Sequence, residues 1–344
     1  MLGLPGSGGL AEGGHGEAAG ALCSHGDVLP AEEERGMDEG LRPQLAAWLK
    51  NYNRKLEQAG AAGPMEAQAV RDGLARLTRA LVTRPVPLPL VVDAEVAGAA
   101  GEVAVRIFHP EPQTRLPLAV YLHGGGHVAG SVAVFDPLCR RIAVAARRVV
   151  VSVDYRLAPE HPYPAALDDA AAALAGSREA VARLGLPCRE PTALIGDSAG
   201  GALAASLVHR GLAPGVERLA LVYPLLDYGL DHPSLERFAS GYLIEKERML
   251  WSLERYFQNG EDRRQASPLH MDVPPGFPPT FLAVAGFCPL RDEALAYGER
   301  LRRHGVAVAC HHFPEVVHAF LHLEDLVDTD CRRLYRLLGG FLCS

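Results

Sequence analysis

The chain has 344 residues, of which 48% are hydrophobic and 22% are charged, and its formal net charge is −7. This composition is typical of a globular protein with a large core, and the lack of a basic block or stripe argues against a nucleic-acid or anionic-membrane partner. No apolar run approaches the roughly 20 residues that a membrane-spanning helix needs.

Residues 1–36 are rich in glycine and acidic side chains, and they carry too little apolar surface to offset the entropy of ordering. We therefore expect a disordered tail, which also lacks the basic start and apolar core of a signal peptide. Met37 opens a helical pattern and is a hypothetical start of the protein. The seven cysteines include no CxxC pair, which favours a reducing compartment. The expected location is the cytoplasm.

Two helices are expected before the first strand. Apolar residues recur at helical spacing over 41–56 and again over 67–81, after a break that contains glycine and proline. The proline-rich segment 84–91 is expected to be an extended connector, because each proline disfavours helix at the residue before it.

From that connector onward, apolar strands alternate with helices. The predicted strands lie at 102–110, 116–123, 148–155, 192–196, 218–224, 279–286 and 306–314. The predicted helices lie at 138–146, 166–185, 198–211, 293–305 and 328–342. This order predicts an α/β fold with a mostly parallel sheet covered by helices on both faces. An amphipathic insert, helical over 234–265, interrupts the alternation and is typical of a lid or binding element.

One turn carries a candidate nucleophile. The segment "IGDSAGGA" places Gly196 and Gly200 on either side of Ser198, between a predicted strand and a predicted helix. This is a G-x-S-x-G turn, in which a tight bend leaves no room for a Cβ and lifts the serine hydroxyl above the sheet edge. Taken alone, the motif also fits an ordinary glycine-rich turn.

A second glycine-rich loop indicates where negative charge could be stabilised. The segment "YLHGGGHVAG" puts three consecutive glycines directly after another apolar strand, so that backbone N–H groups can approach a developing oxyanion. Together with the N–H of Ala199, those of Gly124 and Gly125 are expected to form an oxyanion hole. The alternative is a flexible surface loop.

The base is expected late in the chain, because this turn precedes the acid and then the histidine in chain order. His318, in "FPEVVHAFLH", follows the last predicted strand and fits best. His311 and His312 lie within that strand, so at most one could face the site. His322 could share a metal with His318 on a helix, but no third ligand has suitable spacing. We therefore expect no metal. Surface positions are expected for His232, His270 and His304.

The segments HGGG, YRLAPEHPYPAALDD, GDSAGG, PLRDE and HAF occur in this order. Jointly they resemble the hormone-sensitive lipase branch of the α/β-hydrolases, a bacterial group of small carboxylesterases. The resemblance implies cap helices over 37–85, an α/β-hydrolase core over 86–344 and a cap insert over about 228–266. It implies that the segment from Tyr155 to Glu160 braces the site. His127 departs from a usually aromatic position, which could alter the pocket lip.

The sequence departs from the family pattern Asp-Pro-Leu-x-Asp-Glu at its first residue. That Asp is the triad acid in the family, and Cys288 stands in its place. A neutral thiol would orient His318 poorly, whereas a charged His318 could favour the thiolate. Asp292 or Glu293 could substitute as the acid one helical turn away. A disulfide from Cys288 to Cys310 is a further alternative, although no oxidising context is apparent.

The resulting expectation is a serine carboxylesterase that acts on short-chain acyl esters through an acyl-enzyme and needs no cofactor. Ser198 would attack, His318 would transfer the proton, and activity would be reduced because Cys288 replaces the acid. The competing class is a non-catalytic small-molecule-binding protein on the same fold. A prolyl-type peptidase is disfavoured, since too few residues precede the sheet to form a propeller gate. The family resemblance leaves room for a homodimer.

Overall fold

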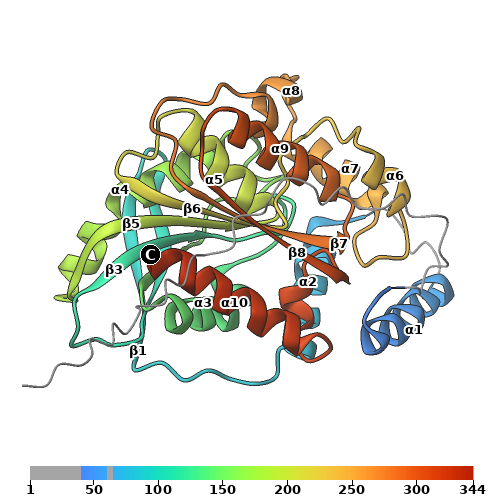
Figure 1. Cartoon of the computed structure of the whole chain (residues 1–344), viewed down its shortest axis with the longest axis horizontal. Coiled ribbons are helices and arrows are strands. Elements are labelled where there is room, and N and C mark those ends of the chain that lie inside the picture. Colours follow the sequence, from blue (N-terminus) through green and yellow to red (C-terminus); the bar gives the residue numbers. More distant parts are fainter. Residues whose placement is uncertain (1–39, 60–64, 344) are drawn as a thin grey trace, which may run out of the picture. The chain divides into compact units, whose positions relative to one another are not determined.

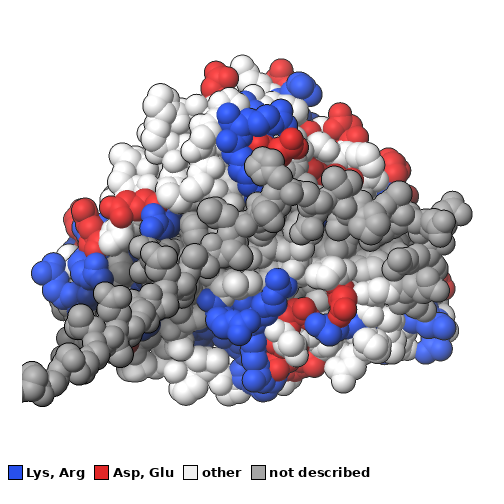
Figure 2. Space-filling view, viewed as in Figure 1, with Lys and Arg blue, Asp and Glu red and all other residues white. Residues whose placement is uncertain are grey.

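The structure is a computed structural model that describes residues 40–59 and 65–343. The disordered tail expected over 1–36 and the hypothetical start at Met37 lie outside the described residues. No helix of the described part is long and apolar enough to span a bilayer. On the face shown in Figure 2, basic and acidic side chains are interspersed.

Eight strands form one sheet in the order β1-β2-β4-β3-β5-β6-β7-β8. From β4 to β8 all neighbouring strands are parallel, whereas β1–β2 and β2–β4 are antiparallel. This is the mostly parallel sheet that the alternation of strands and helices predicted. The strands are β1 (Leu90–Gly98), β2 (Gly101–His109), β3 (Leu116–Leu122), β4 (Val149–Val153), β5 (Cys188–Asp197), β6 (Val216–Val222), β7 (Thr280–Phe287) and β8 (Val308–Val317).

Helices cover both faces of this sheet (Figure 1). On one face α3 (Val132–Ala146) packs against α10 (Asp328–Cys343), and both contact the sheet. On the other face lie α4 (Ala165–Arg183), α5 (Ala199–His209) and α9 (Arg291–Arg303). The arrangement confirms the predicted α/β class.

Burial along the strands follows their place in the sheet. Every residue of β4 is buried, and so are all residues of β3 except Pro117, because helices cover both faces of these strands. The sequence did not predict the edge strand β1. The predicted extended connector ended at residue 91, and the first predicted strand began at residue 102. Asp93 and Glu95 face solvent along β1, and the strand becomes recognisable only through its pairing with β2.

The long insert lies between β6 and β7. It holds α6 (Pro233–Arg237), α7 (Lys246–Tyr256), α8 (Arg263–Ala266) and the 3₁₀ turn η1 (Pro268–His270). The prediction of a helix over 234–265 was therefore wrong in its continuity. Gly241 has φ 89° and Leu243 has φ 77°, and such left-handed residues end a right-handed helix.

The two N-terminal helices match the predicted periodicity and contact the rest of the chain through defined hydrogen bonds. They are α1 (Pro43–Ala59) and α2 (Ala67–Leu81). On α1, Asn53 donates to the carbonyl of Gly241 in the insert at 2.9 Å. On α2, Arg71 donates to the carbonyl of Val128 at 2.9 Å, just beyond the triple-glycine loop, and pairs with Glu160. Both helices are thus positioned at the C-terminal edge of the parallel strands.

Candidate active site

Ser198 stands at the turn between β5 and α5 with φ 50° and ψ −123°. A non-glycine residue in this region of φ is strained, and such strain is typical of functional sites. The backbone is held there because Ser198 N–H donates to the carbonyl of Val222, and its own carbonyl accepts from Gly201 and Leu225. Ser198 as a whole is 9% exposed, so the residue is nearly enclosed.

The glycines around Ser198 are required by close backbone approach. A Cβ on Gly196 would lie 2.3 Å from the carbonyl oxygen of Gly200. A Cβ on Gly200 would lie 2.1 Å from the carbonyl oxygen of Leu122, at the end of β3. Both contacts are with backbone, which cannot move aside cheaply. The motif therefore sets the turn directly on the neighbouring strand.

His318 lies after β8, and its ring joins the two halves of the site. Its Nε2 lies 2.9 Å from Ser198 Oγ, and its Nδ1 lies 3.2 Å from Cys288 Sγ. Burial, with the neighbouring His322 adding to it, lowers the pKa of His318 to about 3. The ring is therefore neutral near pH 7, the state in which an imidazole can accept a proton.

Cys288 follows β7 and occupies the position on the far side of His318. It is 2% exposed, and burial raises the pKa of its thiol above the ordinary value. The geometry thus brings the thiol to the histidine but keeps it neutral, which disfavours the thiolate alternative. No disulfide joins Cys288 to Cys310, both of which lie within the described residues, so the disulfide alternative is not realised.

The two carboxylates offered as substitute acids are engaged elsewhere. Asp292 accepts from the backbone N–H of Ser234 at 2.9 Å and from Arg291 Nε at 2.9 Å. Glu293 is buried and accepts from the N–H of Leu226 at 2.6 Å. Their positions do not support the hypothesis that either acid replaces the family Asp, because both carboxylates bind other groups and Nδ1 of His318 meets Cys288 instead.

The triple-glycine loop corrects one expected oxyanion donor. The N–H of Gly124 donates to Asp197 Oδ1 at 2.8 Å, so it is not available to a ligand. Among the hydrogen bonds of the described residues, none is donated by the backbone N–H of Gly125, Gly126 or Ala199. The loop N–H groups that can donate to an oxyanion are therefore those of Gly125 and Gly126, one residue later than the expected pair of Gly124 and Gly125.

Asp197, next to the serine, was not singled out from the sequence. Its Oδ1 accepts from Tyr121 at 2.6 Å as well as from Gly124, while its Oδ2 has no partner. Burial raises the pKa of Asp197 to about 7, against the opposing effect of these two donors. The carboxylate therefore anchors the glycine loop to the serine turn. Its place before Ser198 was the only signal for this role.

His127 lies in the core rather than at the pocket lip. Its ring stacks on Tyr256 of α7 with centroids 3.8 Å apart, and its Nε2 lies 3.1 Å from the hydroxyl of Tyr228. Burial lowers the pKa of His127 to about 3. The departure from an aromatic residue thus changes how the insert packs on the glycine loop, not the rim of the cavity.

A cavity of about 460 Å³ opens above Ser198. Its floor includes Gly125, Gly126, Ser198 and His318, and its remaining walls are mostly apolar. Side chains of α1, α2 and the insert contribute most of the upper wall. These are Tyr52, Leu56, Val70, Leu74, Arg76, Leu77, Leu230, Leu243, Ile244, Arg248, Met249, Ser252 and Leu253.

The alternative in which His318 and His322 share a metal does not match the geometry. Instead, His322 Nδ1 lies 2.7 Å from Thr78 Oγ1 of α2. The pair also lies on a turn followed by the 3₁₀ helix η2 (Phe320–Leu323), so the spacing of an α-helix does not apply.

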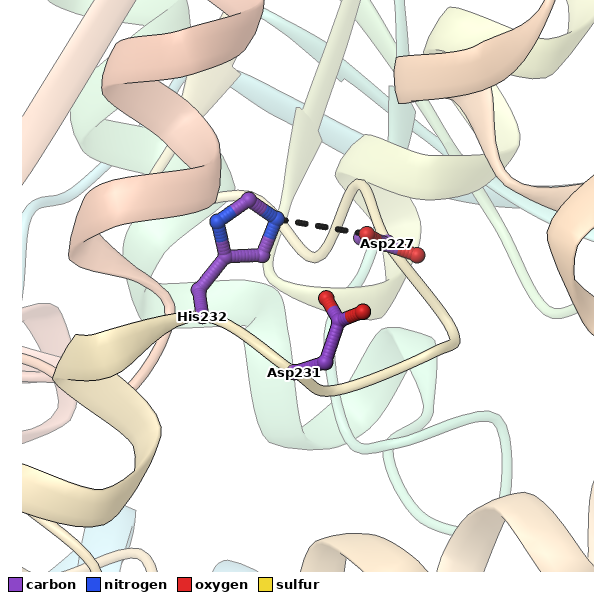
Figure 3. Close-up of side chains that lie close together, drawn as sticks. All are labelled: Asp227, Asp231 and His232. Atoms are coloured by element: carbon purple, nitrogen blue, oxygen red, sulfur yellow. Dashed lines mark hydrogen bonds and ion pairs between the residues drawn. The ribbon is translucent and has the colours of Figure 1, made fainter.

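Within the described residues, one group of side chains could hold a metal ion, and it lies in the insert. The ligand atoms of Asp227, Asp231 and His232 fall within 4.8 Å of one another. Figure 3 shows the imidazole of His232 directed at the carboxylate of Asp227. That carboxylate accepts from His232 at 3.2 Å, His270 at 3.1 Å and Gly229 N–H at 2.9 Å. Both histidines are half-buried rather than on the surface as expected, and these hydrogen bonds account for them.

Comparison with known proteins places this geometry in a family. A family model described as alpha/beta hydrolase fold matches residues 119–322. The chain is 37% identical over 271 residues to Esterase LipI of Mycobacterium tuberculosis, covering 76% of this chain and 83% of that protein. It is 33% identical over 303 residues to ethyl acetate hydrolase of Pseudomonas putida, covering 84% and 94%.

A solved structure gives the same result. An ester hydrolase from the metagenome of Lake Arreo, complexed with a derivative of bipyridine phosphonate, superposes with a TM-score of 0.81 at 31% identity, covering 88% of this chain and 98% of that one. Likeness in sequence and in fold therefore agree. The chain belongs to the alpha/beta hydrolase fold family, within the group of bacterial esterases related to hormone-sensitive lipase.

Proposed function

We propose that the protein is a serine carboxylesterase that hydrolyses small esters through an acyl-enzyme. One observation carries the proposal. The hydroxyl of Ser198 lies 2.9 Å from Nε2 of a neutral, buried His318, at the floor of a largely apolar cavity. Beside it stand backbone N–H groups without a partner among the described residues. Nucleophile, base and oxyanion donors are the three parts that acyl transfer needs.

The reaction follows from these positions. Nε2 of His318 accepts the proton as Ser198 Oγ bonds to the ester carbonyl carbon, and the tetrahedral oxyanion is stabilised by Gly125, Gly126 and Ala199. His318 then protonates the departing alkoxide, so that the alcohol leaves and an acyl-serine remains. Water attacks the acyl-serine with His318 again as base, which releases the carboxylic acid and restores the hydroxyl.

Cys288 sets the expected rate. A carboxylate can only accept a hydrogen bond, so it fixes the proton of His318 on Nδ1 and stabilises the imidazolium that forms. A neutral thiol can donate or accept, and when it donates to Nδ1 the proton stays on Nε2, which can no longer act as base. In another triad, replacing the acid by its amide lowers turnover by about 10⁴-fold. We therefore propose a weakened but intact catalytic site.

The shape of the cavity supports a cap that selects small substrates. Its upper wall comes from α1 and α2, within residues 37–85, and from an insert that includes residues 228–266. We assign these two segments as the cap and the remainder of 86–344 as the catalytic core. A volume of about 460 Å³ fits short acyl chains better than long ones.

Two experiments test the function. A fluorescent organophosphonate should label the protein covalently at Ser198, because this reaction requires an activated serine, and peptide mass spectrometry should locate the adduct. Ethyl esters of increasing acyl length should show hydrolysis that is highest for short chains. If labelling occurs at another residue, or if no ester is hydrolysed even by Cys288→Asp, the esterase proposal is wrong.

The buried neutral thiol favours one competing function, a non-catalytic binding protein on the same fold. Such a protein would bind small molecules in the cavity without forming a phosphonate adduct. Retention of the contact between Ser198 and His318 weighs against it, since binding alone does not require that contact.

We also propose that the protein works in a reducing compartment, the cytoplasm. The support is that no disulfide joins any of the six cysteines within residues 40–59 and 65–343, as expected where thiols stay reduced. Growth of the producing cell followed by fractionation and blotting would test this location.

A further inference from the structure

The cap side of the cavity carries positive charge and no acidic side chain. Arg76 of α2 and Arg248 of α7 both line it, and the cap residues that share the wall with them are neutral. The acid of the cavity, Asp197, lies at the floor and already accepts from two donors. A small apolar ester by itself offers nothing to these two guanidinium groups.

Arg248 is the more enclosed of the two. It is half-buried in the first turn of α7, and no ion pair or hydrogen bond joins its side chain to any other described residue. Glu245, an acid close by in the sequence, accepts from the backbone N–H of Gly241 at 3.1 Å rather than from Arg248. Burial lowers the pKa of Arg248, and the electrostatic attraction of Tyr52 and Glu245 offsets only part of that effect.

The position of Arg248 along α7 relates it to the reacting atoms. Ser252 lies one helical turn later on the same face, and a Cβ added to Gly126 would stand 3.2 Å from Ser252 Oγ. The backbone of Arg248 thus lies about 6 Å along the helix axis from that of Ser252, the residue that approaches the oxyanion loop. A substrate whose ester carbonyl occupies that loop can place a second group against Arg248.

We propose that Arg248 binds an anionic group of the substrate, so that the preferred esters carry a carboxylate a few carbons from the ester bond. This inference rests on the proposed esterase function and specifies its substrate class. A carboxylate matches the planar guanidinium in a two-hydrogen-bond geometry, and a partly desolvated site strengthens the contact. Arg76, exposed on the opposite helix, adds a second positive charge at the same wall.

Paired substrates of equal carbon number test the proposal. Monoethyl adipate carries its charge on the acyl side and is compared with the neutral ethyl hexanoate. Sodium 6-acetoxyhexanoate carries its charge on the alcohol side and is compared with the neutral hexyl acetate. In at least one pair the anionic ester should have the higher kcat/KM. The ratio of kcat/KM for the anionic ester to kcat/KM for its neutral counterpart should fall about tenfold or more in Arg248→Met, which is the scale of a lost hydrogen bond to a charged group.

Two further variants control for charge in general. Arg255→Met removes a positive charge from the same helix, but Arg255 stacks over Trp251 and does not line the cavity, so the ratio should stay unchanged. Arg248→Lys keeps the charge and should retain part of the preference. If Arg248→Met leaves both ratios unchanged, or if Arg255→Met lowers them equally, the assignment of Arg248 is wrong.

Binding measurements separate failure of this inference from failure of the function. With Ser198→Ala, calorimetric titration of the same esters requires no turnover. Monoethyl adipate or 6-acetoxyhexanoate should bind more tightly than its neutral counterpart, and the added Arg248→Met change should remove the difference. Tighter anion binding without hydrolysis by any variant would uphold the Arg248 site and reject the esterase. Hydrolysis of esters with equal binding of both pair members would do the reverse.

Discussion

The two loops that meet at His318 differ in what they supply to the ring: one provides a tightly held nucleophile, and the other provides no charge. The turn that carries Ser198 is fixed by glycines whose replacement would press a Cβ into backbone, and its serine accepts a strained conformation. The β7–α9 loop also places Cys288 within hydrogen-bond distance of the ring, at 3.2 Å from Nδ1, but supplies a neutral thiol. Geometry is retained on both sides of the histidine, whereas charge is missing on one. Position and electrostatics are therefore separable parts of this site.

The largest effect should come from the serine side. Ser198→Ala removes the nucleophile, so phosphonate labelling should vanish and ester hydrolysis should fall by at least about 10³-fold. The melting temperature should change little, because His318 is the one hydrogen-bond partner of the hydroxyl among the residues that the structure describes. Residual labelling of the variant would show that another residue reacts.

The acid side should respond in the opposite direction. Cys288→Asp supplies a carboxylate that can only accept from Nδ1 of His318, so kcat should rise by roughly 10²-fold or more. Cys288→Ser is the matched control, since it keeps a neutral donor and acceptor and should give no such gain. Unchanged kcat in Cys288→Asp would mean that the site does not depend on an acid at this position.

The pH dependence of kcat/KM should differ between the protein with Cys288 and the Cys288→Asp variant, because the group beside His318 sets the pKa of its ring. With the pKa of His318 lowered to about 3, the ring stays neutral as the pH falls, and kcat/KM at pH 5 should lie within about threefold of its value at pH 7. In Cys288→Asp the carboxylate favours the imidazolium and raises this pKa. The same pH change should then cost about tenfold in kcat/KM.

Folding must be followed in the same samples. A histidine whose pKa is lowered in the folded state favours unfolding as the pH falls below its ordinary value near 6.5. His127 and His322, like His318, have a pKa lowered to about 3. Asp197, with its pKa raised to about 7, opposes them, since folding favours its protonated form. Circular dichroism at each pH separates a true acid limb from loss of structure.

The smallest effect should come from Asp292. Its carboxylate caps the N–H of Ser234 and meets Arg291, away from the imidazole. Asp292→Asn should therefore change kcat/KM by less than about threefold, within the range of ordinary surface substitutions. A loss of 10²-fold or more, without a fall in melting temperature, would instead restore Asp292 as the working acid.

The sequence by itself determined the strand order along the chain, the serine turn and the late histidine. These features are local, because each signal is contained in a short stretch of sequence. The signals are the periodicity of the strands, the G-x-S-x-G turn and a histidine that follows the last strand. The prediction from sequence was wrong for the elements whose secondary structure depends on tertiary packing. The edge strand β1 is defined by pairing with β2, and the left-handed residues that break the insert helix become visible only in the fold.

Only the tertiary structure decided which groups of the site are available. Gly124 and Gly126 look equivalent in the sequence, yet the first donates to Asp197, whereas the second lines the cavity. Cys288 meets the histidine, whereas Asp292 turns away. Arg248 is one arginine among many in the sequence, and only the packing of the cap places it in the wall of the cavity. Hydrogen bonds and burial join residues far apart in the chain, and those distances are set when the sheet, helices and cap pack together.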